Sequence, residues 1–203
     1  STFKIFTVAQ ALELDLVDPK TKINTKGPIR IGGHKINDYR NNGPELPVWQ
    51  VITESSNLGT ARIAKLIGPE KQREFLSSLG FTKPTSIEMI EASGGKPLLP
   101  KRWNELETMT ISYGHGLSAT PLHLATGYAA LANGGRLVKP TLLEGEKFDL
   151  GPQVISKEVA ENSLAMLRGV VTEGTASLAD VNGYFVAGKT GTADKPSAQG
   201  GYD

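Results

Sequence analysis

The first dozen residues constrain the fold most, because they combine an apolar helix pattern with a serine and a lysine one helical turn apart. Ser1 precedes Lys4 by three residues, which places both side chains on one face of a helix. An unassisted serine hydroxyl is a poor nucleophile at neutral pH, and a neighbouring amine can act as the base that it needs. The stretch ends before Asp18-Pro19 and predicts a buried helix. Its apolar residues are Phe3, Ile5, Phe6, Val8, Ala9 and Leu12.

The composition excludes several classes of function. The chain has 203 residues, enough for one domain with its own core, and its 22 basic and 21 acidic side chains give a formal net charge of +1. With its charges balanced in this way, the chain lacks the excess of positive charge that binds nucleic-acid phosphates, so we expect no nucleic-acid partner. The absence of cysteine removes disulfides, thiol nucleophiles and cysteine metal sites. His34, His115 and His123 are too scattered for a metal site, so we interpret them as structural and expect no metal or cofactor.

Serine-x-x-lysine is a weak signal alone, and the chain contains a second example. Ser93 and Lys96 are separated by two glycines and followed by Pro97. Glycine disfavours a helix interior, and so does the position before a proline. We therefore expect no helical turn that would place this second serine and lysine on one face.

Two further motifs strengthen the first pair as the candidate site. Ser55-Ser56-Asn57 lies between two predicted helices, and Lys189-Thr190-Gly191-Thr192 follows a predicted strand. The three motifs in this order are the signature of penicillin-binding proteins and serine β-lactamases. The chain resembles a class B penicillin-binding protein across essentially its whole length, and within that class it is most similar to the division-specific transpeptidases. Three more segments carry the resemblance, namely Leu117–Leu122, Val171–Thr175 and Val186–Ala193.

The resemblance implies a fold and a setting. We expect an α/β (α+β) chain with the penicillin-binding-protein/serine β-lactamase-like transpeptidase fold, seen as a helix-rich portion with an incomplete antiparallel sheet. Residues 1–203 would be part of one transpeptidase domain, a fragment that lacks flanking strands and the membrane anchor. No apolar run approaches the roughly 18 residues of a membrane span. The resemblance places the catalytic domain on the periplasmic side of a bacterial inner membrane.

The resemblance also implies catalytic roles. Ser1 would be acylated by the D-Ala-D-Ala end of a peptidoglycan stem peptide, and Lys4 would take its proton. Ser55 would relay a proton towards the leaving amine, and Asn57 would hold the substrate amide and the Lys4 side chain. Lys189, facing Lys4 as a second cation, would lower the pKa of Lys4 together with burial.

Substrate binding is expected at the third motif. Lys189, Thr190 and Thr192 would bind the terminal carboxylate of the substrate, and the edge of a strand containing Gly191 would align the peptide. The backbone N–H groups of Ser1 and Thr192 would form the oxyanion hole. A Ser1 with a free amine in place of an amide would alter that hole.

The activity implied is serine-type DD-transpeptidation that cross-links peptidoglycan stem peptides at the septum during cell division. β-Lactam antibiotics would inhibit it covalently, and membrane proteins of the division complex would be partners. A β-lactamase would need a deacylating pair, but the corresponding stretch offers Glu88 and Glu91 without a matching asparagine. A penicillin-recognising sensor, an N-terminal-nucleophile hydrolase and a purely structural domain remain as alternatives.

Local patterns predict the other elements. Residues 29–36 read as a hairpin around Gly32-Gly33, and residues 184–187 read as a strand. We make no detailed prediction for residues 81–107. Helices are predicted over residues 46–54, 57–66, 69–80, 120–133 and 156–174. The apolar composition of residues 120–133 predicts that this helix is buried.

Overall fold

The computed structural model describes residues 1–145 and 150–192, and these ranges combine helices with short antiparallel strands. The helices are α1 (Lys4–Glu13), α2 (Val48–Thr53), α3 (Asn57–Ile67), α4 (Pro69–Ser78), α5 (Glu105–Ile111), α6 (Pro121–Ala132) and α7 (Lys157–Thr172), with 3₁₀ helices at Ile90–Gly94 and Ser177–Ala179. The strands are β1 (Lys22–Asn24), β2 (Ile29–Ile31), β3 (His34–Ile36), β4 (Glu45–Pro47), β5 (Arg136–Val138) and β6 (Leu150–Gln153).

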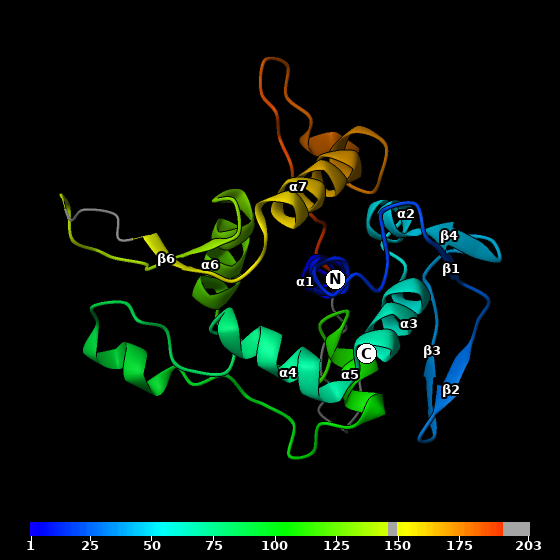
Figure 1. Cartoon of the computed structure of the whole chain (residues 1–203), viewed down its shortest axis with the longest axis horizontal. Coiled ribbons are helices and arrows are strands. Elements are labelled where there is room, and N and C mark those ends of the chain that lie inside the picture. The colour runs from blue at the N-terminus through cyan, green and yellow to red at the C-terminus, as the bar shows by residue number, and fades with distance from the viewer. Residues whose placement is uncertain (146–149, 193–203) are drawn as a thin grey trace.

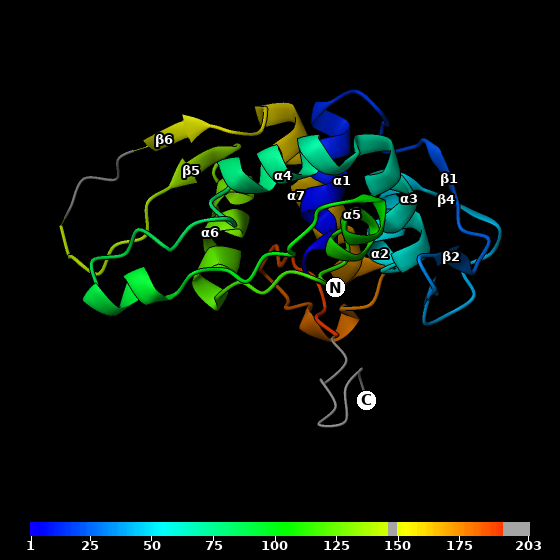
Figure 2. The ribbon, with the colours of Figure 1, turned by 90° about the horizontal axis from the view of Figure 1, so that it is seen from below.

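Helix α1 lies at the centre of the helices (Figure 1), and its N-terminus is near the middle of the molecule in both views (Figure 2). Every residue from Lys4 through Leu12 is buried. A helix that is apolar on nearly all sides can be stable only when other elements cover it on all sides. The predicted core helix is therefore confirmed, and it fixes the place of the residues that precede it.

An aromatic cluster joins α1 to α6 and to Phe81, which follows α4 in the sequence. Phe6 lies edge-on to Phe81, with ring centroids 5.2 Å apart, and edge-on to Tyr128 on α6 at 5.4 Å. Phe3 meets Phe81 at 4.8 Å in the same manner. Such contacts stabilise by about 0.5–1.5 kcal/mol beyond the burial of area. The cluster anchors the start of α1 on two sides.

Gly127 on α6 is the close-approach position of this cluster. A Cβ atom there would lie 2.8 Å from Cζ of Phe6 and 3.0 Å from Cζ of Phe81. Although alanine favours a helix over glycine, we expect Gly127→Ala to lower the free energy of unfolding by about 1–3 kcal/mol because it overpacks the core. Urea denaturation measures this, with Ala125→Ser on the exposed face of α6 as the control. An unchanged or higher stability would contradict the crowding argument.

The strands form three separate antiparallel pairs, β1 with β4, β2 with β3 and β5 with β6. The pair β5–β6 lies at the end of the molecule opposite the other two pairs (Figure 2). The predicted hairpin is confirmed as β2–β3, and Gly32 and Gly33 have φ values of +54° and +78°, as a tight hairpin turn requires. The described chain is thus α+β, with its strands outside the helical core.

Most predicted helices are confirmed, including the start of α6 at Thr120-Pro121 and of α7 at Ser156. The expectation that α6 is buried throughout is wrong, because it packs through one face. Its buried residues are His123, Gly127, Ala130 and Leu131. Helix α5 was not predicted. A 3₁₀ helix at Ile90–Gly94, also unexpected, ends before Lys96.

The predicted strand at residues 184–187 is wrong. A strand requires a backbone ladder with a neighbour, and among the described residues this segment contacts a helix instead. The carbonyl of Val186 accepts a hydrogen bond from the Arg168 side chain, and the N–H of Gly188 donates to the carbonyl of Leu167, both on α7. Tyr184 and Phe185 are exposed. The β-branched and aromatic composition of these residues therefore predicts an extended backbone but does not predict pairing with a neighbouring strand.

Within the described ranges, every helix is too short or too polar to span a bilayer. The same residues contain no group of three or more His, Cys, Asp or Glu side chains that could hold a metal ion.

Candidate active site

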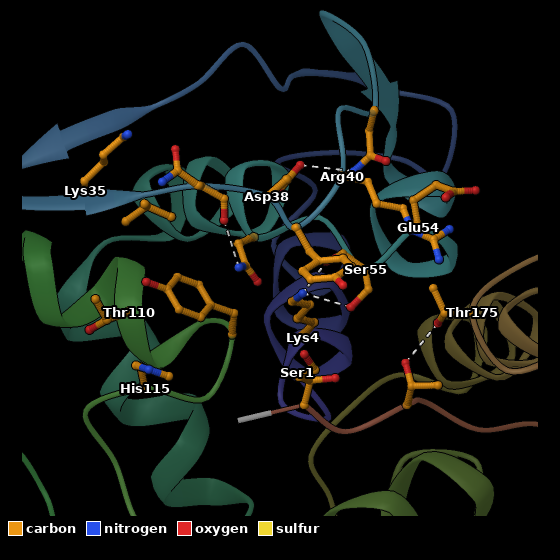
Figure 3. A pocket seen from close by; sticks show the side chains of 18 of the residues that line it. Ser1, Lys4, Lys35, Asp38, Arg40, Glu54, Ser55, Thr110, His115 and Thr175 are labelled. Carbon is orange, nitrogen blue, oxygen red and sulfur yellow. Dashed lines mark hydrogen bonds between the residues drawn. The ribbon is translucent and has the colours of Figure 1, made fainter. Parts of the chain in front are cut away.

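The three motifs meet at one end of α1, although Ser1 and Lys189 are 188 residues apart in the sequence. Figure 3 shows Ser1, Lys4 and Ser55 there. Lys4 comes from α1, Ser55 from the junction between α2 and α3, and Lys189 from the extended segment after α7. Lys4 Nζ and Lys189 Nζ each donate a hydrogen bond to Ser55 Oγ at 2.9 Å. Lys4 Nζ also donates to the carbonyl oxygen of Ser55. A single hydroxyl therefore joins two amines.

Ser1 lies at the same end of α1 and lines a cleft of about 810 Å³ together with Lys4 and Ser55. The residue at the N-cap of α1 is Phe3, with no side-chain capping bond, so Ser1 does not cap the helix but lies in the turn before it, where its carbonyl accepts a hydrogen bond from Lys4 N. The hydroxyl of Tyr128 donates to the carbonyl of Thr2 at 2.9 Å and helps to hold this end of the chain. Ser1 is half-buried.

Lys4 is unusual because its side chain is almost fully buried, with 1% of the residue exposed. Burial, and then the positive charge of Lys189, lower the pKa of Lys4 from 10.5 to about 7, while the carboxylate of Asp38 partly opposes this change. A substantial fraction of Lys4 is therefore neutral near pH 7, and a neutral amine can accept a proton.

Lys189 sits in a different environment at the same hydroxyl. Burial lowers its pKa from 10.5 to about 8, so it is mostly charged near pH 7. Its Nζ also donates to Thr190 Oγ1 at 3.1 Å, and Thr190 Oγ1 lies 2.9 Å from Thr175 Oγ1. A cation flanked by hydroxyl groups is suited to binding a carboxylate.

The backbone at Ser55 is strained, because its φ of +58° lies in the left-handed region that only glycine adopts freely. This conformation turns the Ser55 carbonyl and hydroxyl towards Lys4. Neighbouring contacts hold the turn, since Ser55 N donates to Ile52 O and Ser56 N donates to Val51 O. Strain that the surrounding structure holds in place is common at functional sites.

This strain gives a matched pair of variants. Ser55→Gly and Ser55→Ala both remove the hydroxyl, but only glycine tolerates the positive φ at no cost. We expect the glycine variant to be more stable than the alanine variant by about 1 kcal/mol. Thermal unfolding of the two proteins measures the difference, and equal melting temperatures would contradict the argument. Both variants should lose the bridge between the two lysines.

The middle of the second motif is tied to the loop after β3. Ser56 is the N-cap of α3 and accepts a hydrogen bond from Gly59 N at 2.9 Å, so the capping role falls to Ser56 and not to Ser55 or Asn57. Asp38 accepts bonds from Ser56 Oγ at 2.7 Å and from Leu58 N at 2.9 Å. These contacts fix the residue that follows Ser55.

Asn57 lines the cleft. Its expected contact with Lys4 is not formed, because its Nδ2 donates instead to the carbonyl of Asn37 at 3.0 Å. The third motif is also only partly at the cleft. Thr190 and Thr192 line it, whereas Gly191 lies beside Thr2, where a Cβ would be 3.5 Å from the Thr2 methyl group.

Several cleft residues were missed by sequence reasoning. Asp38 contacts the second motif, and nothing in its local sequence marks it for that contact. Thr175 contacts the third motif; it ends the segment Val171–Thr175 that carries the resemblance, but no role was predicted for it. His34 and His115, interpreted as structural, line the cleft. His123 is structural as predicted, because it is buried and completes the capping box of α6 with Thr120.

The family model for the penicillin-binding protein transpeptidase domain matches residues 1–203. The chain belongs to the penicillin-binding protein transpeptidase family. The resemblance drawn from the three motifs is thereby confirmed, and the converging lysines occupy the motif positions of such a transpeptidase.

Curated relatives place this transpeptidase chain among the class B penicillin-binding proteins. A probable peptidoglycan D,D-transpeptidase FtsI from Caulobacter vibrioides is 34% identical over 201 residues, which cover 96% of this chain and 34% of that protein. The peptidoglycan D,D-transpeptidase FtsI of Escherichia coli K12 is 30% identical over 203 residues, covering 100% of this chain and 34% of that protein. The chain thus spans about a third of the length of the curated relatives it matches.

Solved structures confirm the predicted transpeptidase fold. The transpeptidase domain of penicillin-binding protein 3 from Burkholderia pseudomallei is 36% identical, with a TM-score of 0.89 over 100% of this chain and 62% of that chain. Penicillin-binding protein 3 from Mycobacterium tuberculosis, in complex with aztreonam, is 28% identical, with a TM-score of 0.85 over 100% of this chain and 50% of that chain. The α+β fold class is therefore confirmed.

Proposed function

We propose that the protein containing this chain is a serine DD-transpeptidase that cross-links peptidoglycan stem peptides in cell division. The observation that carries the proposal is the convergence of Lys4 and Lys189 on the hydroxyl of Ser55, a residue that lines one cleft together with Lys4 and Ser1. The arrangement provides a nucleophile, an amine with a lowered pKa, a proton relay and a carboxylate-binding cation. Relatives named peptidoglycan D,D-transpeptidase FtsI support the same reaction and the role in division.

Acylation is the first half of the proposed reaction. Ser1 Oγ attacks the carbonyl of the penultimate D-alanine, and neutral Lys4 Nζ accepts the hydroxyl proton. The peptide bond breaks, and the leaving D-alanine amine receives a proton through Ser55, whose hydroxyl already contacts Lys4. Lys189, with Thr190 and Thr192, holds the terminal carboxylate during this step. The products are an acyl-enzyme on Ser1 and free D-alanine.

Transfer of the acyl group completes the cycle. An amine of a second stem peptide attacks the ester carbonyl and gives up a proton to Lys4, the new amide bond forms as the ester bond to Ser1 Oγ breaks, and Lys4 returns the proton to Ser1 Oγ. We assign Asn57 to the substrate amide, since it lines the cleft next to Ser55. The strained β-lactam amide would react with Ser1 in the same way, and a relative whose structure was determined with aztreonam supports this inhibition.

Hydrolysis of the acyl-enzyme, as in a β-lactamase, has little support. Glu88 and Glu91 are the acidic residues of the stretch that corresponds to the deacylating loop of a β-lactamase, and neither lines the cleft. Glu88 instead accepts a hydrogen bond from Leu142 N and pairs with Lys139. The chain therefore favours a long-lived acyl-enzyme.

We also propose the setting of this reaction. By analogy with its FtsI relatives, the catalytic domain would face the periplasm, and an anchor would hold the protein in the inner membrane next to membrane proteins of the division complex. A septal localisation of the tagged full-length protein in dividing cells would test this part.

The test of the reaction uses the full-length protein with a synthetic stem pentapeptide as donor and a stem peptide with a free amine as acceptor. We expect a cross-linked dimer and one released D-alanine for each new bond, and prior incubation with penicillin should block both. A protein that forms a penicillin adduct but no dimer would be a sensor domain. A protein that forms neither would have a structural role.

A further inference from the structure

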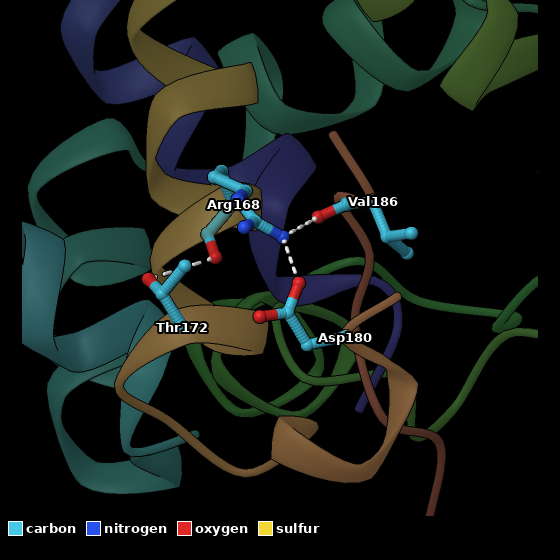
Figure 4. A network of polar contacts seen from close by, with 4 residues as sticks. All are labelled: Arg168, Thr172, Asp180 and Val186. Carbon is cyan, nitrogen blue, oxygen red and sulfur yellow. Dashed lines mark hydrogen bonds and ion pairs between the residues drawn. The ribbon is translucent and has the colours of Figure 1, made fainter. Parts of the chain in front are cut away.

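The segment that carries Lys189 is attached to α7 at two consecutive positions. The guanidinium of Arg168 donates through Nη1 to the carbonyl of Val186 at 2.9 Å and to Asp180 Oδ1 at 2.7 Å (Figure 4). One residue earlier on the helix, the carbonyl of Leu167 accepts from the N–H of Gly188 at 3.1 Å. Lys189 follows this second contact directly, so its backbone leaves α7 from a fixed point.

The same segment has few other supports before Lys189. Tyr184 and Phe185 are 72% and 96% exposed and contribute little packing, and residues 184–187 form no strand with any described part of the chain. The N–H of Tyr184 makes only a local turn bond to Val181. An exposed segment with few buried contacts is free to shift unless polar contacts hold it.

Arg168 is well suited to hold it. Its side chain is 29% exposed, and Asp180 neutralises it from the loop that leads into the segment. A charge-assisted hydrogen bond to a carbonyl is stronger than a neutral one, and the planar guanidinium can serve both partners in fixed directions. Thr172 Oγ1 donates to the Arg168 carbonyl at 3.3 Å one turn later, where α7 ends.

We infer that Arg168, paired with Asp180, is a positioning residue for Lys189: it sets where residues 186–188 leave α7, so that Lys189 Nζ reaches the Ser55 hydroxyl. This inference rests on the proposed function for its effect on acylation, whereas its effect on the segment does not depend on that function. Arg168 itself lies outside the residues that line the cleft, so it acts through the placement of Lys189.

The first measurement is hydrogen–deuterium exchange of the full-length protein. Arg168→Met keeps the length of the side chain but removes both hydrogen bonds. We expect faster exchange within residues 186–192, above all at the Gly188 amide, with the middle of α7 unchanged. Lys157→Met is the matched control, because it breaks the exposed pair with Glu161 on the same helix, outside this network. Unchanged exchange in the segment would overturn the inference.

The second measurement is the rate of acylation by a fluorescent penicillin. We expect Arg168→Met to lower the second-order rate constant roughly tenfold, because a displaced binding group misplaces the reacting carbonyl. In a protein that already carries Lys189→Ala, adding Arg168→Met should change the remaining acylation rate by less than about twofold, because both substitutions act through the Lys189 side chain. The slow reaction of these variants is followed over hours.

The outcomes separate the two proposals. A tenfold loss that persists in the Lys189→Ala background would show that Arg168 acts by another route and would overturn the inference. A wild-type protein that is not acylated at all would overturn the proposed function, while the exchange experiment would still decide whether Arg168 positions the segment.

Discussion

Replacing Ser1 with alanine should abolish the covalent penicillin adduct of the full-length protein. The proposed acylation forms a bond to Ser1 Oγ, and alanine has no atom that can take its place. Ser1 does not cap α1, and its backbone contact to Lys4 is made through its carbonyl, so the variant should fold as the wild type does. Intact-protein mass spectrometry before and after incubation measures the adduct, and peptide mapping identifies the acylated residue.

The control for this prediction is another serine-to-alanine change away from the cleft. Ser78 is exposed at the end of α4, and its hydroxyl donates to the carbonyl of Phe75, one turn earlier on the same helix. Ser78→Ala should retain the full adduct. An adduct that survives in Ser1→Ala and maps to a different residue would show that the nucleophile has been assigned wrongly, whichever family the chain belongs to.

Replacing Lys4 with methionine should lower the rate of acylation by about 10²–10⁴-fold, the usual contribution of a general base. Methionine has a similar length and suits an apolar site, and the wild-type residue is 1% exposed. The loss should therefore come from the missing amine and not from a collapsed core. Lys65→Met on the exposed face of α3, where Lys65 pairs with Glu105, is the control and should keep the wild-type rate.

The pH dependence of acylation gives this prediction a second readout. The pKa of Lys4 is lowered to about 7, so the neutral base becomes available as the pH rises through 7. The pKa of Lys189 is lowered to about 8, so the cation that binds carboxylate is lost as the pH rises through 8. The second-order rate constant should be bell-shaped with its maximum between these values. Lys4→Met should lose the acid limb.

The stability of the fold should respond to Lys4 in the same range. The unfolded chain keeps the ordinary lysine pKa of 10.5, so between pH 7 and 10.5 it binds more protons at this residue than the folded chain does. The contribution of Lys4 to the free energy of unfolding therefore rises with pH through this window, and it is least favourable below pH 7.

An acylation rate in Lys4→Met equal to the wild type, with the same fall in rate below pH 7, would exclude Lys4 as the base.

The parts of the fold that were predictable are those in which a local pattern decides the structure. The core helix α1, the hairpin at Gly32-Gly33 and the starts of α6 and α7 follow from periodicity, backbone freedom and capping within a few residues. The strand at residues 184–187 could not be judged in this way. Its composition favours an extended conformation, but only a neighbouring strand converts that conformation into a sheet.

The sequence by itself determined the family and the buried helix. It also indicated that Ser1 lies near Lys4, although α1 begins only at Lys4 and the two residues are joined by the turn that precedes the helix. Only the tertiary structure decided that Ser55 adopts a left-handed conformation and bridges Lys4 and Lys189. It alone brought Asp38 to the second motif and Arg168 to Val186, in the segment that leads to the third motif. These contacts join residues that are 18 to 134 positions apart in the sequence. The distances between these residues are set by how whole helices and loops pack together, and no local sequence pattern encodes that packing.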